Sequence, residues 1–533
     1  MARSTEPVAH SHSRQGVTLR QGAFVLAGIF AALVLTHLPL LRLPYYWDEA
    51  GYYIPAAYDF LRSGSLIPYS TLSNAHPPLP SLYLAVLWKL FGFTPLVTRI
   101  AMCFVSAVAL AAVYALSVET TGKPQVGAAT VLVTALYPIW FAQSTLAHAD
   151  MFAAAAVLWG IYFYLRDRAG WGAAVCFSLA VLAKETALVT PLALAIWEMR
   201  LAAGEPNPRR RLSTIARLVL PILPLALWYL YHWRRTGFVF GNPEYLRYNA
   251  TQTLTPLRIL LAFLHRLMHI TLHMNLFVPV LAMFACMLLP PVAEDRNAPR
   301  ERISFADQKV FYAVIAASVL CFSVLGGALL TRYLLPCYPL VLLMCVNTFR
   351  RRLRGWLGLV ALTLAAFVAG LFVNPPYRFA PEDNLAYSDM IRLQQAAIQQ
   401  IETRYPGATV LTAWPASDEL TKPELGYVSQ PLPVVPIDNF SFAQVERAAQ
   451  SPTSYTVALI FSTKYDPPHL LLSLGHWNQL YDQRFFSFHR DLSAAAAARL
   501  LGGSVVWRQQ RKGQWAALIH FDRPVEARLS FLP

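Results

Sequence analysis

Apolar runs long enough to cross a membrane follow one another along roughly the first 373 residues of the chain. A spanning helix needs about 20 apolar residues, and fewer where neighbouring helices shield its ends. The candidate spans lie near residues 22–41, 96–117, 125–143, 149–165, 171–183, 186–199, 215–232, 273–291, 308–330, 333–348 and 356–373. This pattern predicts a multi-span α-helical membrane protein with about 11 to 13 transmembrane helices.

Two further apolar segments do not fit a simple crossing. Residues 79–91 form a run that is too short to span, and residues 256–271 carry two arginines and two histidines in an amphipathic pattern. Such segments lie favourably in the plane of the membrane surface. We therefore expect both at the interface between lipid and water.

Composition and charge support this interpretation. The 533 residues are 56% hydrophobic and only 14% charged, whereas soluble domains have about a quarter charged residues. The net charge of +15 comes from arginines in short loops beside apolar runs, which is a topology signal and not one for nucleic acid. The six cysteines all lie inside apolar runs, so neither a disulfide framework nor a Cys-based metal site is expected.

The charge pattern also predicts the topology. With a cytoplasmic N-terminus and eleven crossings, the basic loops around Lys123, 166–168, 200–211, 294–307 and 350–354 all fall inside, as the positive-inside rule requires. The predicted domains are then a cytoplasmic tail 1–21, a transmembrane domain 22–373 and a periplasmic domain 374–533, with the first periplasmic loop at 43–95. We expect this topology in an inner (plasma) membrane.

The last 160 or so residues have the composition of a soluble domain. A helical pattern covers residues 387–404, buried-type strands are predicted at 407–414 and 456–462, and a hairpin turns near Lys512 and Gly513. Strands that alternate with helices predict a small C-terminal α/β domain.

The first outside loop contains two adjacent carboxylates, Asp48 and Glu49, directly after a predicted span. Carboxylates near lipid are costly unless they have a function. Neighbouring residues on a helix point about 100° apart, so one of the two, for which we favour Asp48, faces a substrate while the other caps or orients. The alternative is that both only cap an interfacial helix.

Other polar residues lie at the same predicted face. His76 follows in the first loop, and His148 and Asp150 stand at the mouth of the next helix, where a plain helix cap is an alternative for Asp150. Lys184 and Glu185 interrupt a long apolar stretch. They form either an ion pair with each other or a site in which the lysine binds a phosphate.

Arg332 lies between two apolar runs at the same outer boundary. Its planar guanidinium suits two phosphate oxygens, and snorkelling to lipid headgroups is the alternative. All these residues come from separate stretches of sequence but fall on one side of the membrane. Carboxylates and cations together at a membrane boundary suit a substrate that is part lipid, part phosphate and part polyol.

These motifs resemble the GT-C superfamily, and within it the protein O-mannosyltransferases and the aminoarabinose (lipid A) transferases. The resemblance covers about residues 20–350 and leaves the tail unmatched. Aminoarabinose transferases carry a lysine at the position of His76, and the chain lacks the WWD motif of oligosaccharyltransferases. The motifs are the DE pair at Asp48, HPPLP from His76, Asp150, the KE turn at Lys184 and RYLLPCYP from Arg332 to Pro339.

The resemblance implies an inverting glycosyltransferase that takes a sugar from a polyprenyl (undecaprenyl) phosphate donor and gives it to a hydroxyl of a protein, lipid or glycan. Asp48 would be the general base, with Glu49 as the second catalytic carboxylate. Lys184, Arg332 and His76 would hold the donor phosphate. The acceptor or the loop would be oriented by His148, Asp150, Glu185, Tyr52 and Tyr53.

The aromatic residues of the first loop have two interpretations, since they suit both stacking on sugar rings and an interfacial belt. No metal is expected to be obligatory, although a divalent cation is not excluded, and no nucleic acid is expected as a partner. A transporter or flippase of lipid-linked sugars is the alternative function, and a membrane-anchored binding or assembly protein is a third. Transporters favour midplane charges and internal repeats, neither of which the sequence contains.

Overall fold

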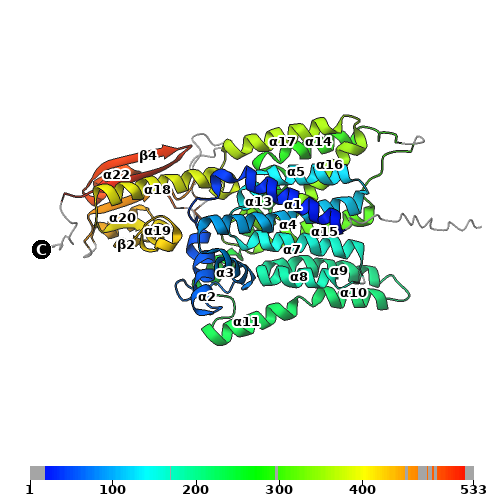
Figure 1. The fold of residues 1–533 in the computed structure, drawn as a ribbon, viewed down its shortest axis with the longest axis horizontal. Coiled ribbons are helices and arrows are strands. Elements are labelled where there is room, and N and C mark those ends of the chain that lie inside the picture. Colours follow the sequence, from blue (N-terminus) through cyan, green and yellow to red (C-terminus); the bar gives the residue numbers. More distant parts are fainter. Residues whose placement is uncertain are drawn as a thin grey trace, which may run out of the picture.

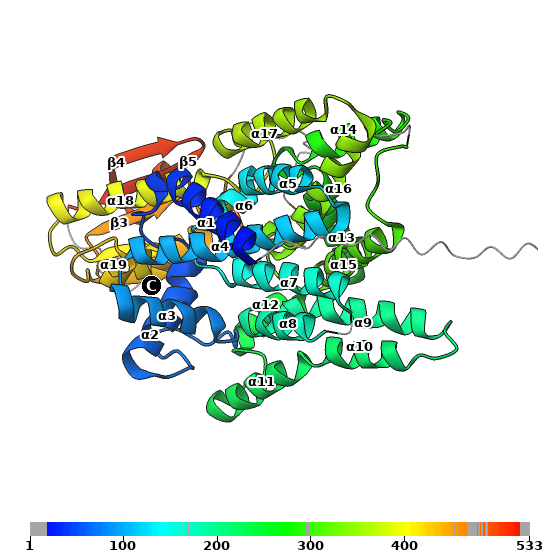
Figure 2. The ribbon, with the colours of Figure 1, turned by 45° about the vertical axis from the view of Figure 1, so that its right-hand side comes forward.

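A computed structural model describes residues 19–168, 170–294, 298–450, 454–465, 477, 480, 483–484 and 489–522. Most of the predicted N-terminal tail lies outside these residues. The chain forms a helical bundle with a smaller sheet domain at one end (Figures 1 and 2).

The bundle consists of helices up to 27 residues long. They are α1 (Leu19–Thr36), α2 (Ile54–Ser63), α3 (Leu79–Phe91), α4 (Pro95–Thr121), α5 (Pro124–Leu136), α6 (Pro138–Gln143), α7 (Ala149–Arg166), α8 (Gly172–Ala183), α9 (Val189–Ala202), α10 (Arg209–Val219), α11 (Ile222–Thr236), α12 (Pro243–Asn249), α13 (Pro256–Thr271), α14 (Phe277–Met287), α15 (Phe305–Val324), α16 (Cys337–Arg352) and α17 (Trp356–Phe372).

Local sequence explains where these helices begin and end. α4 begins at Pro95 behind Thr94, whose hydroxyl accepts a hydrogen bond from the backbone N–H of Val97, so one otherwise unpaired donor of the first turn is satisfied. It ends at Gly122, which adopts a left-handed conformation with φ 63°, as helix C-termini commonly do.

By length and composition, three helices in the described part of the chain are suited to cross a membrane: Pro95–Thr121, Arg209–Thr236 and Phe305–Val324. The count rises to four if the pair Pro256–Asn275 and Phe277–Met287, bent by 97°, is one broken span. Five further apolar helices have only 10–17 residues. The expected 11 to 13 spans therefore stay a prediction, because several apolar runs are divided by turns into pieces too short to meet the length criterion.

The C-terminal domain is built on a five-stranded sheet of order β2-β1-β3-β5-β4. β1 is parallel to β2 and β3, whereas β5 is antiparallel to β3 and β4. This mixed sheet with its helices confirms the predicted small α/β domain. Its elements are α18 (Ala386–Arg404), β1 (Val410–Ala413), α19 (Ala416–Thr421), β2 (Val434–Ile437), α20 (Phe442–Ala449), β3 (Val457–Phe461), α22 (Ala494–Leu501), β4 (Ser504–Arg511) and β5 (Gln514–His520).

The hairpin between β4 and β5 turns at Lys512 and Gly513, which have φ values of 44° and 86°. Tight hairpins favour two such residues because their twist matches that of the strands. Every residue of β1 and of β3 is buried, as expected for strands covered on both faces. The sheet thus brings the end of β1, and Trp414 beyond it, to the bundle.

Candidate functional site

A cavity of about 990 Å³ lies where the bundle meets the C-terminal domain. Its residues come from the first loop, the Lys184 turn, α11, α12, the segment before α16 and the C-terminal domain. Part of the wall is apolar and part is charged. The apolar part includes Leu188, Val189, Leu192, Leu225, Phe240 and Leu325.

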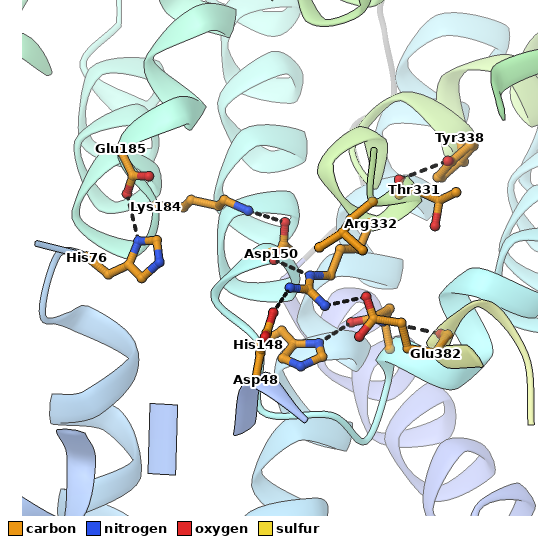
Figure 3. A network of polar contacts seen from close by, with 12 residues as sticks. Asp48, His76, His148, Asp150, Lys184, Glu185, Thr331, Arg332, Tyr338 and Glu382 are labelled. Carbon is orange, nitrogen blue, oxygen red and sulfur yellow. Dashed lines mark hydrogen bonds and ion pairs between the residues drawn. The ribbon is translucent and has the colours of Figure 1, made fainter. Parts of the chain in front are cut away.

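Arg332 is the centre of the charged part (Figure 3). It belongs to the short 3₁₀ helix η7 (Thr331–Leu334) and is 3% exposed. Its guanidinium donates to Asp48 through Nη2 and to Glu382 through Nη1, and Nε lies 3.3 Å from Oδ2 of Asp150. One arginine thus joins carboxylates from the first loop, from α7 and from the segment that leads into the C-terminal domain.

Lys184 is the second cation of this cluster. It stands in an extended conformation between α8 and α9, and its Nζ lies 2.5 Å from Oδ1 of Asp150 and 4.0 Å from the ring centre of Tyr333. Glu185 pairs with His76 and not with Lys184. The alternative of an ion pair between the two neighbours is therefore wrong, because the turn sends their side chains to different partners.

The cluster holds three carboxylates, Asp48, Asp150 and Glu382, but only the two cations Arg332 and Lys184. Burial raises the pKa of Glu382 to about 8, although Arg332 alone would lower it. An uncompensated buried charge is costly, so the third carboxyl keeps its proton near neutral pH. A neutral carboxyl accepts a weaker hydrogen bond from an arginine than an ionised carboxylate would.

Two buried arginines of α13 hold the segment that carries Arg332. Arg258 donates to the carbonyls of Gly326 and Gly327, at 2.9 and 3.0 Å. Arg266 donates to the carbonyls of Phe322 and Leu330, at 3.1 and 2.7 Å. Cations bind well at a helix C-terminus, where carbonyls lack partners, so α13 fixes the end of α15 and the turn after it.

Asp48 faces the cavity, and its side chain is 34% exposed. It precedes the π-helical segment η2 (Glu49–Tyr53) but makes no side-chain capping bond there. Its carboxylate binds Arg332 instead. The preceding residue, Trp47, has a φ of 46°, which is rare for a large side chain and marks a strained backbone.

Glu49 points away from the cavity into the protein core. Its carboxylate binds Arg99 at 2.5 Å and accepts hydrogen bonds from the backbone N–H groups of Ala147 (2.6 Å) and Tyr46 (2.9 Å). Arg99 also donates to the carbonyls of Pro44 and Thr145. The expectation that Glu49 is a second catalytic carboxylate is therefore corrected, because the side chain is 0% exposed and holds the loop behind the site.

His76, Tyr52, Tyr53 and Glu185 lie together in another part of the same cavity. Nδ1 of His76 is 3.2 Å from Oε2 of Glu185, and its ring stacks on Tyr53. The hydroxyl of Tyr245 lies 3.4 Å from Nε2 of the same histidine. In this arrangement His76 is paired with a carboxylate and is not part of the Arg332 cluster.

His148 and Asp150 differ in position although they are two residues apart. Asp150 is bound by Lys184 and approached by Arg332. His148 is fully buried, shares a 2.8 Å hydrogen bond with the side chain of Gln143 and is not among the residues that line the cavity. Its expected role in orienting an acceptor would have to be indirect.

Sequence reasoning missed Glu382 and Trp414, both of which line the cavity. Glu382 had a recognisable signal. The acidic pair of Glu382 and Asp383 follows the last apolar run at the same predicted face as the pair of Asp48 and Glu49. Asp383 packs behind the site, where it binds His273 at 2.9 Å and the hydroxyl of Thr331. Trp414 is brought to the cavity only by the docking of the C-terminal domain.

Comparison with known proteins matches part of the chain to a family. Residues 75–232 match the family model described as dolichyl-phosphate-mannose-protein mannosyltransferase. No curated protein sequence matches the chain.

The fold is similar to that of ArnT from Cupriavidus metallidurans. The crystal structure of ArnT bound to undecaprenyl phosphate has a TM-score of 0.53 and 14% identity, covering 94% of this chain and 98% of that chain. The apo structure has a TM-score of 0.51 and 16% identity, covering 93% and 98%. These matches cover most of the tail, which sequence motifs could not match. The resemblance predicted from the motifs is thereby confirmed by the family model over residues 75–232 and by the similarity of the fold to that of ArnT.

Proposed function

We propose that this chain is an integral membrane glycosyltransferase of the inverting type, which moves a sugar from a polyprenyl (undecaprenyl) phosphate to a hydroxyl acceptor. The observation that carries the proposal is the cavity itself. One part of its wall is apolar, as a lipid chain requires, and the other part holds Asp48 beside Arg332 and Lys184. The family match and the likeness to ArnT, whose structure is described as bound to undecaprenyl phosphate, support it.

In this reaction Asp48 takes the proton of the acceptor hydroxyl as the new bond forms. The acceptor oxygen attacks the anomeric carbon from the face opposite the phosphate, and the bond between that carbon and the phosphate oxygen breaks. The bonding electrons leave with the polyprenyl monophosphate. Asp48 suits the role of general base because it is the most exposed of the three carboxylates in the cluster.

Arg332 and Lys184 stabilise the charge that develops on the leaving phosphate. Both are buried and already aimed by their carboxylate partners. The N–H groups of Arg332 point at three carboxylates, so one of these must lose its contact with the arginine when a phosphate binds. Glu382 is the partner that yields, since its raised pKa makes it the weakest anion of the set. His76 helps to hold the donor near Glu185 and Tyr245.

We further propose that the protein lies in the inner (plasma) membrane, with a cytoplasmic N-terminus and a periplasmic C-terminal domain. The distribution of arginines along the sequence supports this orientation. No group of three or more His, Cys, Asp or Glu side chains in the described part of the chain is placed to hold a metal ion. That the reaction needs no metal stays a prediction, and transfer should persist after exhaustive treatment with a chelator.

The test is a transfer assay with purified protein in lipid vesicles. A panel of undecaprenyl-phosphate sugars is offered together with protein, lipid and glycan acceptors, and the release of free undecaprenyl phosphate is measured. We expect release with at least one donor and loss of release in Asp48→Asn, which keeps the shape of the side chain. If no donor is consumed but labelled donor crosses the vesicle membrane, the protein is a transporter.

A further inference from the structure

The first loop, which carries Asp48, is held from one side by the C-terminal domain. The backbone N–H of Tyr45 donates to the carbonyl of Leu425 at 3.3 Å, and the hydroxyl of Tyr427 donates to the carbonyl of Tyr45 at 3.0 Å. Trp414, directly after β1, packs against Trp47 with ring centres 4.9 Å apart and planes at 72°. A soluble domain thus contacts the residue immediately before the proposed base.

Trp414 also packs against the loop after Asp48. A Cβ atom on Gly51 would lie 2.7 Å from Cζ2 of Trp414, closer than real contacts allow. The backbone of Gly51 does not have a positive φ, so glycine is needed here for space and not for its conformation. The indole therefore contacts the loop on both sides of Asp48, at Trp47 and at Gly51.

The strained backbone at Trp47 makes this contact important. A large residue with positive φ persists only where its surroundings enforce it, and the ring of Trp414 is one of the groups in contact with Trp47. Without that ring, Trp47 has less to keep it in the left-handed region. A return to ordinary φ values would rotate the next residue, Asp48, away from Arg332.

We propose that Trp414 is a positioning residue, through which the C-terminal domain holds Asp48 in place for proton transfer. This inference rests on the proposed glycosyltransferase function and deepens it. It makes the C-terminal domain part of the catalytic unit, and not a module that only binds acceptors. Trp414 also lines the cavity, so the experiment must separate positioning of Asp48 from direct contact with a substrate.

A double-mutant cycle makes this separation, because residues that act through one another have non-additive effects. The variants are Trp414→Ala, Asp48→Asn and the double variant, and the probe is an undecaprenyl-phosphate sugar that the wild type consumes in vesicles. A misplacement of about 1 Å can cost about 100-fold in rate, so we expect Trp414→Ala to lower kcat about 100-fold. In the Asp48→Asn background the same change should have no further effect.

Gly51→Ala tests the same contact without touching the C-terminal domain. Its methyl group would displace the indole, so we expect a loss of kcat like that of Trp414→Ala and little additional loss when the two are combined. Gly358→Ala in α17 is the matched control, since a Cβ there has no heavy atom within 4 Å. Trp507→Ala, in the edge strand β4, controls for the loss of a tryptophan from this domain.

Trp414→Phe should recover most of the activity if the role is aromatic contact with Trp47. A wild-type rate in Trp414→Ala, or effects of Trp414→Ala and Asp48→Asn that multiply, would overturn the inference while the glycosyltransferase function stands. No release by the wild type with any donor overturns the function and this inference together. If Trp414→Ala does not fold, as judged by size-exclusion chromatography and thermal unfolding, Gly51→Ala and Trp414→Phe decide the question.

Discussion

Two buried arginines bind the adjacent carboxylates Glu49 and Asp48, and the surroundings of the two ion pairs differ. Arg99 binds Glu49, which is 0% exposed and also accepts hydrogen bonds from backbone N–H groups. Arg332 binds Asp48, which is 34% exposed at the wall of a cavity. The first site is a closed piece of core, and the second is open to a ligand.

The two sites differ in how completely their buried polar groups are paired. Glu49 meets one cation and two N–H groups, which suffices for a buried carboxylate. In the Arg332 cluster Nε of Arg332 and Oδ2 of Asp150 lie 3.3 Å apart with no hydrogen bond, and the carboxylates outnumber the cations. Such incomplete pairing costs stability, and sites that keep it are frequently functional. The comparison therefore separates a structural pair from the pair that we propose to be catalytic.

Asp48→Asn should have the largest effect on activity, and it tests whether the open site is the catalytic one. Removing a general base costs about 10²- to 10⁴-fold in rate, while the exposed side chain should lose little stability. The measurement is kcat for release of undecaprenyl phosphate, with thermal unfolding recorded on the same preparation. Binding of the undecaprenyl-phosphate sugar should persist. A variant that turns over like the wild type would remove Asp48 from the mechanism.

Glu49→Gln should have the opposite effect, which is a loss of stability without a loss of activity. It leaves Arg99 buried without a counter-charge, which costs about 3–5 kcal/mol of stability, so the midpoint of thermal unfolding should fall. Molecules that remain folded at low temperature should keep a kcat near that of the wild type. The double variant with Glu49→Met and Arg99→Met is the control, and it should recover part of the stability because neither charge remains buried alone. A stable but inactive Glu49→Gln would show that Glu49 acts on the reaction, either directly or by positioning the loop that carries Asp48.

The sequence predicted the members of the cluster better than their partners. Asp48, Asp150, Lys184 and Arg332 could be recognised because charges beside apolar runs are costly and therefore informative. Their contacts could not, since the break after α8 directs Lys184 to Asp150 and Glu185 to His76. Adjacency in sequence had suggested a pair that the three-dimensional structure does not form.

The tail shows the other limit of sequence reasoning. Its strands and hairpin were predictable from apolar runs and turn residues, and the sheet confirms them. The place of Trp414 at the cavity was not predictable, because it depends on where the domain docks and no local pattern encodes that docking. The acidic pair after the last apolar run was a signal for Glu382, but its contact with Arg332 could not be read from the sequence. The number of spans was hard to predict for a related reason, since an apolar run that is divided by a turn looks continuous when hydropathy is averaged over a window.

Lys184→Gln tests whether the second cation of the open site binds the donor phosphate. A hydrogen bond to a charged group contributes about 1.5–3 kcal/mol, so we expect the KM for the donor to rise about 10- to 100-fold. Asp150 loses its nearest cation at the same time, and kcat should fall as well. Arg209→Gln, at the start of α10 on the basic side, is the control and should leave both parameters unchanged. Equal donor KM values in wild type and Lys184→Gln would mean that the lysine only neutralises Asp150.

Glu382→Gln should have the smallest effect, and it should depend on pH. Below about pH 8 the carboxyl of Glu382 is protonated and neutral like glutamine, so the variant should resemble the wild type. Above its pKa the ionised carboxylate competes with the donor phosphate for Arg332. The donor KM of the wild type should therefore rise as the pH increases, by up to about tenfold at one unit above the pKa, and that of the variant should not.

The donor is a phosphodiester with a single fixed charge, so its own titration cannot produce this rise. Measuring KM and kcat across the range separates weaker donor binding from a change in the chemical step, because the chemical step is reported by kcat. A wild-type KM that is flat through this range would mean that Glu382 is not the partner that yields. The phosphate would then have to displace Asp150, which is also bound by Lys184, or bind without displacing any carboxylate. In the second case Arg332 would serve mainly to hold Asp48.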